Sequence, residues 1–512
     1  MTVGSPDPET LHRGELDLLF TDLVQAGFRP RSDDRRHWVG PIRESLRKLT
    51  RADQIRIEIR DGWPYQHPYI HVDGLGTRKH VNQAGNTCLW FEDDNDYGQW
   101  LRLDTILARI DAWVADQEAG PAEPALDAHL YFPGRVPGLL MLDLGNLLER
   151  GQITARAGAS GELRVQGSGP TYALGDRGSF SAGWFWQQGI VAPPTTPDAL
   201  RHVLSAGQRR LYDRLTTSIS RSQPAFMLLL WDDHGEVNAL GLRVERRTPG
   251  HYALAAMEVA RVDPAVMRLR AGPDVALLRD CGVAVFGVGA IGSEAAVLLA
   301  RSGLGTLTLV DGELLRPANL TRHTASGRFV GLPKVKALAE TIAEARLPTR
   351  VDTVEAMLWQ PSLVRGVVER THLVVDTTGN AAYTDMLSRL CVDGRRPLVA
   401  SALHRGGRIL RIRVQMAETK APIWHRSGSN GFPDVPADPA PKAQQTWEVG
   451  CGAPINNASP VSVTGAGSRT ARAVVDVLAG RVDRDLDMFE IYEGIEDARF
   501  AEPGALVIET RA

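Results

Sequence analysis

A glycine-rich turn between two apolar strands constrains the fold of this chain more than any other feature. The stretch reads VAVFGVGAIGSEAAVLLARSGLGTLTLVD: Gly287, Gly289 and Gly292 follow the first strand, an apolar helix comes next, and the second strand ends at Asp311. This is the βαβ fingerprint of a dinucleotide-type site. Glycines let the backbone approach a phosphate, the helix N-terminus presents free N–H groups, and the aspartate accepts hydrogen bonds from ribose hydroxyls. We therefore expect a nucleotide site on a parallel sheet.

Taken alone, the fingerprint favours an NAD(P)-dependent oxidoreductase, which is its commonest setting. The following residues, GELLRPANLTRHTASGRFVGLPKVKAL, add Asn319, Arg322 and Lys334. Cleaving a triphosphate between its α- and β-phosphates builds charge that arginine and lysine neutralise, whereas hydride transfer needs no such cations. The alternative is that Arg322 and Lys334 are solvated surface charges.

The order of an acidic residue, NLxR and GxxK resembles the signature of the ubiquitin-activating and ThiF/MoeB-like adenylating family, over roughly residues 278–480. The resemblance implies a Rossmann-like, ThiF-type adenylation domain that uses ATP. It further implies that Asp311 binds the ribose, and that Asn319, Arg322 and Lys334 lie at the phosphates.

The same family places a magnesium-binding aspartate just before an asparagine, after a later strand. Here the segment reads HLVVDTTGNAAYTDMLSRLC, so Gly379 precedes Asn380 and the usual ligand is missing. Asp376, at the end of the strand, is the substitute candidate for nucleotide and magnesium binding. Mg²⁺ is still expected with ATP, because phosphate oxygens and water can fill most of its octahedral shell.

The four cysteines, Cys88, Cys281, Cys391 and Cys451, form no CxxC pair, so neither a disulfide framework nor a structural zinc site is indicated. Cys451 stands between two glycines, after the Pro- and Ser-rich residues 417–450. Flanking glycines admit an acyl-adenylate to the sulfur, and the family resemblance implies that Cys451 is the thioester cysteine. The alternative is a small buried residue in a turn. Cys281 and Cys391 are expected to pack in the core.

Two or three domains are expected from length, because 512 residues exceed the size at which one core usually stops growing, and the patterns along the chain divide it into three. Residues 1–120 carry helical apolar spacing at 14–28 and 103–114 around an alternating strand at 55–59, which predicts an α+β domain. Residues 121–270 form a mixed middle domain without a chemical motif. Residues 271–512 repeat strand, turn and helix, which predicts a mostly parallel sheet. The fold class is multidomain α/β.

The N-terminal domain carries a second candidate site. The pieces PYQHP, His80-Val81-Asn82, Gly85 and Cys88-Leu89 resemble the active-site segment of ubiquitin-conjugating enzymes, over about residues 14–118. The resemblance implies that Cys88 carries an acyl group. Two roles fit Asn82: its amide donates to the oxyanion formed when an amine attacks a thioester, or it holds the turn through backbone hydrogen bonds. Val81 replaces the family's proline.

A conjugating-like domain before an adenylating domain resembles the bacterial fused activating and conjugating enzyme of type II CBASS antiphage operons. The resemblance implies a homodimer that uses ATP and Mg²⁺ to activate the C-terminus of a cGAS/DncV-like nucleotidyltransferase, or of a ubiquitin-like protein, and to join it to target lysines. The net charge of −3 disfavours nucleic-acid binding. No apolar run of 18 residues and no secretory start occur, so we expect a cytoplasmic protein without a membrane segment.

Other classes stay open. An NAD(P)-dependent oxidoreductase explains the glycine fingerprint but neither cysteine motif. A non-catalytic partner-docking scaffold needs no reactive Cys88. An adenylating enzyme of sulfur-carrier maturation is a closer variant, and it predicts a thiocarboxylate product.

Overall fold

The chain divides into two compact units, Met1–Arg261 and Val262–Ala512. The boundary lies nine residues before the predicted start of the adenylation domain at 271. The predicted boundary near residue 120 falls inside the first unit and stays a prediction. The computed structural model describes residues 12–31, 33, 35–76, 78, 80–82, 85–87, 89–90, 98–119, 128–132, 135–142, 144, 152–157, 163–168, 179–187, 193–217, 225–233, 236–248, 250–356, 360–423, 434–436 and 457–509.

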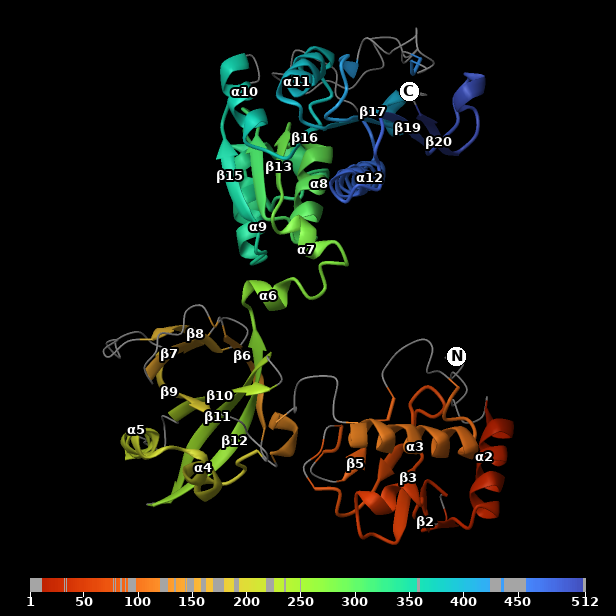
Figure 1. Cartoon of the computed structure of the whole chain (residues 1–512), viewed down its shortest axis with the longest axis vertical. Helices are drawn as coiled ribbons and strands as arrows, with labels where there is room; N and C mark the ends of the chain where they lie inside the picture. The colour runs from red at the N-terminus through yellow and green to blue at the C-terminus, as the bar shows by residue number, and fades with distance from the viewer. Residues whose placement is uncertain are drawn as a thin grey trace, which may run out of the picture. The chain divides into compact units, whose positions relative to one another are not determined.

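The N-terminal part of the first unit is an antiparallel sheet packed against two helices (Figure 1). The sheet has the order β1-β2-β3-β4-β5, and every neighbouring pair is antiparallel. Alternate residues of β3, Ile55 and Ile57, face a core shared with Leu19 and Leu23 of α2 and Ile106 of α3. The elements are α2 (Arg13–Gln25), β1 (Arg29–Pro30), β2 (His37–Pro41), η1 (Ser45–Lys48), β3 (Gln54–Glu58), β4 (Tyr69–His71), β5 (Asn86–Thr87) and α3 (Leu103–Ala119).

The expected helices at 14–28 and 103–114 and the expected strand at 55–59 are present as α2, α3 and β3, although α2 ends at Gln25, three residues before the predicted end. Helix α3 extends five residues beyond the predicted stripe, to Ala119. The periodicity of two in β3 is the reason that its arginine and glutamate remain outside the core.

The rest of the first unit is a closed barrel with the strand order β10-β11-β12-β6-β8-β7-β9. Three of its pairings are parallel: β9 with β10, β12 with β6, and β6 with β8. Closure removes free sheet edges, which an open sheet would have to protect. The elements are η2 (Ala128–Tyr131), β6 (Arg135–Leu142), β7 (Gln152–Ala157), β8 (Leu163–Ser168), β9 (Ser179–Gln187), α4 (Pro197–Val203), α5 (Ala206–Thr217), β10 (Ala225–Asp233), β11 (Glu236–Thr248) and β12 (His251–Arg261).

The second unit is built on an eight-stranded sheet of order β15-β14-β13-β16-β17-β18-β19-β20. The first five strands are parallel to their neighbours, and the last three are antiparallel. The strands are β13 (Gly282–Phe286), β14 (Thr306–Val310), β15 (Arg350–Val354), β16 (Leu373–Asp376), β17 (Leu398–His404), β18 (Ile409–Gln415), β19 (Leu486–Ile491) and β20 (Gly504–Glu509). The prediction of a mostly parallel sheet is confirmed.

Helices cover both faces of this sheet. One face packs on α8 (Ala290–Arg301), α9 (Lys334–Glu344) and α12 (Pro460–Leu478), and Figure 1 shows α8 and α12 side by side. The other face packs on α10 (Pro361–Glu369) and α11 (Ala381–Gly394). The short helical turns are α6 (Pro264–Met267), α7 (Val275–Leu278), η4 (Pro317–Thr321), η5 (Gly327–Phe329), η6 (Arg405–Gly407) and η9 (Ala498–Phe500).

Two of the cysteines lie among the described residues of this unit. Cys391 is fully buried in the cluster between α11 and the sheet, and burial raises the pKa of its thiol to about 12. Cys281 is partly buried, packs against the opposite cluster, and donates its S–H to the carbonyl of Leu277 at 3.4 Å. Both thus pack as expected.

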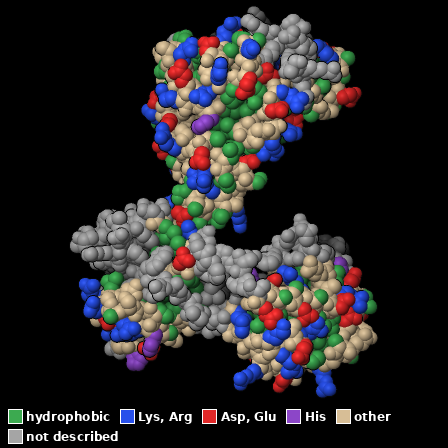
Figure 2. Space-filling model, viewed as in Figure 1, with side chains coloured by type: hydrophobic (Ala, Val, Ile, Leu, Met, Phe, Trp, Pro, Cys, Tyr) green, Lys and Arg blue, Asp and Glu red, His purple; other side chains and the backbone are tan. Residues whose placement is uncertain are grey.

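Lys and Arg side chains lie interspersed with Asp and Glu over the face of the molecule in Figure 2. This mixture accords with the near-balanced net charge. Within the described residues, no helix is both long and apolar enough to cross a bilayer.

Candidate nucleotide site

A cavity of about 520 Å³ lies at the carboxyl ends of β13, β14, β16 and β17. The chain passes from β13 to β14 and β15 on one side, then returns to β16 on the other side of β13. The cavity therefore lies at the switch point of the sheet, where open α/β sheets bind their ligands. It is lined by Gly287, Gly289, Ala290, Ile291, Val310, Asp311, Gly312, Glu313, Arg322, Lys334, Ala356, Thr377, Thr378, Gly379, Tyr383, Ser401, Ala402, Leu403, His404, Ala458 and Val463.

The three fingerprint glycines are required for different geometric reasons. Gly287 has a positive φ of 81°, and a Cβ on it would lie 2.9 Å from the backbone nitrogen of Thr378. A Cβ on Gly292 would collide with the carbonyl oxygen of Gly287. Gly289 is the residue before α8, and a Cβ there would meet no heavy atom within 4 Å. Gly289 thus leaves open space at the helix N-terminus, where a phosphate can approach backbone N–H groups.

Asp311 lies at the end of β14, and both of its carboxylate oxygens accept backbone hydrogen bonds. Oδ2 accepts the N–H of Val288 at 2.9 Å, and Oδ1 accepts the N–H of Glu313 at 2.8 Å. Burial raises the pKa of this carboxyl, while the nearby Lys334 ammonium opposes that rise. The carboxylate therefore fixes the glycine loop against β14 at the wall of the cavity.

Two of the three residues predicted to lie at the phosphates line the cavity, and the third, Asn319, does not. Arg322 and Lys334 both line the cavity, and the Lys334 side chain is 9% exposed and ion-paired with Glu313. Asn319 is not among the lining residues. Its Oδ1 accepts the N–H of Arg316 at 2.9 Å, and its carbonyl accepts the N–H of Arg322 at 2.9 Å. In this structure Asn319 shapes the turn that ends at Arg322.

Asp376 is buried beside the cavity and is absent from its lining. It is 2% exposed, its Oδ1 accepts hydrogen bonds from the N–H and hydroxyl of Thr378 at 2.9 and 2.7 Å, and its Oδ2 accepts from the Thr384 hydroxyl. Burial raises the pKa of this carboxyl. Both oxygens of Asp376 therefore already accept hydrogen bonds from threonines, and its role as a magnesium ligand stays a prediction.

The remaining carboxylates do not form a metal site of their own. Among the described lining residues, the acidic ones are Asp311 and Glu313. Nowhere in the described part of the chain do three or more His, Cys, Asp or Glu side chains gather as metal ligands. Magnesium would therefore enter with the nucleotide and keep mostly phosphate and water oxygens.

A smaller chamber of about 100 Å³ adjoins the cavity and shares Gly379, Ser401, Ala402 and His404 with it. Its lining also includes the predicted Asp376, together with Arg411 and Arg413 of β18, which the sequence patterns did not single out. Arg411 is paired with the buried Asp487 of β19, with its Nε 2.9 Å from Oδ1. Burial and the two arginines lower the pKa of His404 to about 4, so its imidazole is neutral at pH 7.

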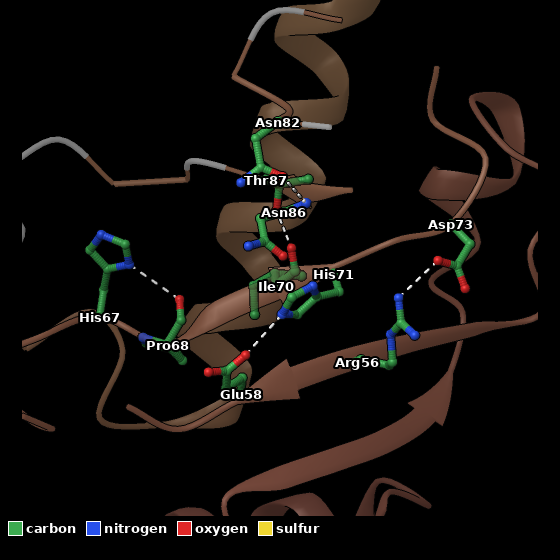
Figure 3. Close-up of polar contacts among 10 residues, drawn as sticks. All are labelled: Arg56, Glu58, His67, Pro68, Ile70, His71, Asp73, Asn82, Asn86 and Thr87. Carbon is green, nitrogen blue, oxygen red and sulfur yellow. Dashed lines mark hydrogen bonds and ion pairs between the residues drawn. The ribbon is translucent and has the colours of Figure 1, made fainter. Parts of the chain in front are cut away.

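The candidate site of the first unit is described only in part, since Cys88 lies outside the described residues. Asn82 is folded onto its own loop (Figure 3): its Oδ1 accepts the N–H of Asn86 at 3.0 Å, and its N–H donates to the carbonyl of Asn86 at 3.0 Å. Gly85 completes the loop with a positive φ of 78°. This is the turn-holding arrangement; the oxyanion role stays a prediction.

The sequence patterns also missed a polar pair near this loop. His71 of β4 lies opposite Asn86 of β5, and its Nε2 is 3.1 Å from Oε2 of Glu58 on β3 (Figure 3). Because the residues come from different strands, only the strand register could have revealed the pair.

The predicted thioester cysteine of the second unit, Cys451, also lies outside the described residues, which resume at Asn457.

Comparison with known proteins links the second unit to one family. Residues 266–442 match the model of the ThiF family. The molybdopterin-synthase adenylyltransferase of Escherichia coli strain K12 is 33% identical over 129 residues, which are 25% of this chain and 51% of that protein. The adenylyltransferase and sulfurtransferase uba4 of Pyricularia oryzae is 32% identical over 135 residues, 26% of this chain and 27% of that protein.

The chain thus spans about half the length, or less, of these curated relatives. A crystal structure of E. coli MccB with ATP aligns with 46% of this chain and 65% of the MccB chain, at 14% identity and a TM-score of 0.34. The family match and the curated relatives do support one conclusion. This is a multidomain α/β protein whose second unit carries a ThiF-type, Rossmann-like domain.

Proposed function

We propose that this chain uses ATP with Mg²⁺ to adenylate the C-terminal carboxylate of a protein. The observation that carries the proposal is a single cavity in which the glycine loop, Asp311, Arg322 and Lys334 meet. The loop and the start of α8 offer backbone N–H groups, the aspartate suits a ribose, and the two cations suit a triphosphate. The ThiF-family match and the adenylyltransferase relatives support the same activity.

In the first step, a carboxylate oxygen of the substrate protein attacks the α-phosphorus of ATP. The bond from the α-phosphorus to the oxygen that bridges it to the β-phosphorus breaks, and pyrophosphate leaves. Charge grows on both fragments, and Arg322 and Lys334 are the described cations at the cavity wall that can offset it. Hydride transfer from a nicotinamide breaks no phosphate bond and so builds no comparable charge for these cations to offset.

In the second step, the thiolate of Cys451 attacks the acyl carbon and releases AMP. Cys451 stands seven residues before Ala458, which lines the cavity. Seven residues of extended chain span at most about 25 Å, so the chain length permits this sulfur to reach the nucleotide site. The acyl group then moves to the thiol of Cys88, and a target lysine amine displaces that sulfur to give an amide or isopeptide bond.

The partners in this proposal rest on the sequence resemblance to the fused antiphage enzymes. The activated protein would be a cGAS/DncV-like nucleotidyltransferase or a ubiquitin-like protein. The enzyme itself would act as a cytoplasmic homodimer in antiviral defence. The middle barrel has no assigned role in this scheme.

The test is intact-mass and non-reducing gel analysis of the full chain with MgATP and the partner encoded beside its gene. We expect a thiol-labile adduct in the wild type, no adduct but continued ATP–pyrophosphate exchange in Cys451→Ala, and an adduct that persists in Cys88→Ala. Absence of exchange with every neighbouring partner would contradict adenylation and favour the docking scaffold. Exchange without any thiol adduct would favour the sulfur-carrier variant.

A further inference from the structure

A buried histidine directly follows Arg322 in the chain. His323 is 7% exposed, and both of its ring nitrogens contact the backbone. Nδ1 accepts the N–H of Ala325 at 3.0 Å, and Nε2 lies 2.9 Å from the carbonyl oxygen of Val288. A backbone N–H can only donate, so Nδ1 must be the acceptor and Nε2 must carry the proton. The imidazole is therefore neutral and donates to Val288.

The central residue of the glycine loop, Val288, is hydrogen-bonded to His323 through its carbonyl and to Asp311 through its N–H. Val288 lies between Gly287 and Gly289; its N–H donates to Asp311 and its carbonyl accepts from His323. The Val288 carbonyl and the Gly289 N–H belong to one planar trans peptide and point in opposite directions. Fixing the carbonyl toward His323 therefore turns the Gly289 N–H away from it.

A second contact fastens the same segment to the first turn of α8. The N–H of Thr324 donates to the hydroxyl oxygen of Ser293 at 3.4 Å, and Ser293 is fully buried. Residues 323–325 are thus tied to both the glycine loop and the helix that follows it. Arg322, immediately before them, lines the cavity together with Gly287 and Gly289.

We propose that His323 is a positioning residue that fixes the Gly287–Gly289 loop and the Arg322 segment relative to each other. The backbone donors of the loop and the Arg322 guanidinium then meet the same triphosphate. This inference rests on the proposed adenylation and adds a residue that contacts neither ribose nor phosphate. A neutral imidazole suits the role because it donates at one nitrogen and accepts at the other, which a lysine or arginine cannot do.

The experiment compares ATP binding by the full-length wild type, His323→Leu and His323→Gln, measured by calorimetric titration with MgATP. Leucine fills the space without hydrogen bonds, so we expect about tenfold weaker binding, the effect of losing both contacts that orient the loop. Glutamine carries one donor and one acceptor at a similar reach, so we expect it to restore most of the affinity. Asparagine is one methylene shorter than glutamine, so His323→Asn should not restore the affinity for ATP.

The matched control is His372→Leu. Nδ1 of His372 also accepts a backbone hydrogen bond, from the N–H of Gly282 at 2.8 Å, at the end of β13 away from the cavity. This variant should lower thermal stability without changing ATP affinity. Equal ATP affinity in wild type, His323→Leu and His323→Asn would overturn the positioning role, as would failure of glutamine to surpass asparagine. A wild type that binds no ATP would overturn the proposed function as well.

Discussion

The cavity edge of the second unit and the 80–87 loop of the first unit were both predicted from a few glycines and polar residues, but they differ in how their residues are used. In the second unit, Gly287, Asp311, Arg322 and Lys334 come from separate segments and line one cavity. In the first unit, the Asn82 oxygen bonds to a backbone N–H only four residues away. The difference teaches that convergence of distant residues supports a site far better than a local turn does.

We expect the largest effect from replacing Lys334, which tests whether the residues that line the cavity act on one nucleotide. Removing an ammonium that offsets phosphate charge should lower the rate of ATP–pyrophosphate exchange by about 100-fold in Lys334→Ala. The matched control is Lys336→Ala, since Lys336 lies in the same helix, pairs with Glu355 and is absent from the cavity lining. Equal losses in both variants would mean that the effect comes from the helix rather than from the cavity.

A second prediction concerns how the stability of the second unit depends on pH. It extends the comparison of the two regions, because the glycine loop at the cavity is hydrogen-bonded to a buried neutral histidine, His323. Burial lowers the pKa of His323 to about 4, below its ordinary value of 6.5. The unfolded chain then binds more protons between these values, so stability is lost as pH falls from 7 toward 4. From pH 7 to 5, His323 should account for about 2 kcal/mol of lost unfolding free energy.

Calorimetry of the full chain at pH 7 and 5 would measure this loss. The transition that MgATP shifts upward identifies the nucleotide-binding unit. In His323→Gln this titrating group is absent, so the same transition should lose less stability between the two pH values. An unchanged pH dependence in the variant would show that His323 is not the group responsible.

The smallest expected effect lies at Asn82. Removing its acceptor oxygen in Asn82→Ala should destabilise the loop by about 1 kcal/mol, seen as faster hydrogen exchange of the Asn86 amide. Asn82→Asp keeps the acceptor but lacks the amide donor, and should retain the protection. If Asn82→Asp keeps the loop protected yet fails to transfer an acyl group from Cys88 to an amine, the amide serves the oxyanion.

The sequence patterns predicted features that depend on local periodicity or on backbone geometry. The strand at 55–59, the helices at its two sides and the βαβ unit with Gly287 and Gly292 follow from spacing and from close backbone approach. The barrel was not predicted, because its parallel pairs, such as β12 with β6, join segments far apart in sequence. Its closure cannot be inferred from short apolar runs.

The residues of the candidate site also divide into those that the sequence patterns predicted and those that they missed. Arg322 and Lys334 were named from the motif and do line the cavity. His323 was missed because its partners, Val288 and Ala325, become informative only when the loop geometry is known. Asp376 was named from its place at a strand end, but strand position alone does not reveal that its oxygens accept hydrogen bonds from two threonines or that it lines the smaller chamber.

The ion pair between Lys334 and Glu313 has a consequence for which anions enter the cavity. The Lys334 side chain is 9% exposed, whereas the side chain of its partner Glu313 is 62% exposed to water. An incoming anion must replace a carboxylate that is already in place, so a monovalent ion such as chloride gains little by binding. A triphosphate brings several charges at once and can displace the glutamate. We therefore expect the resting protein to discriminate among ligands by valence before it recognises any base or sugar.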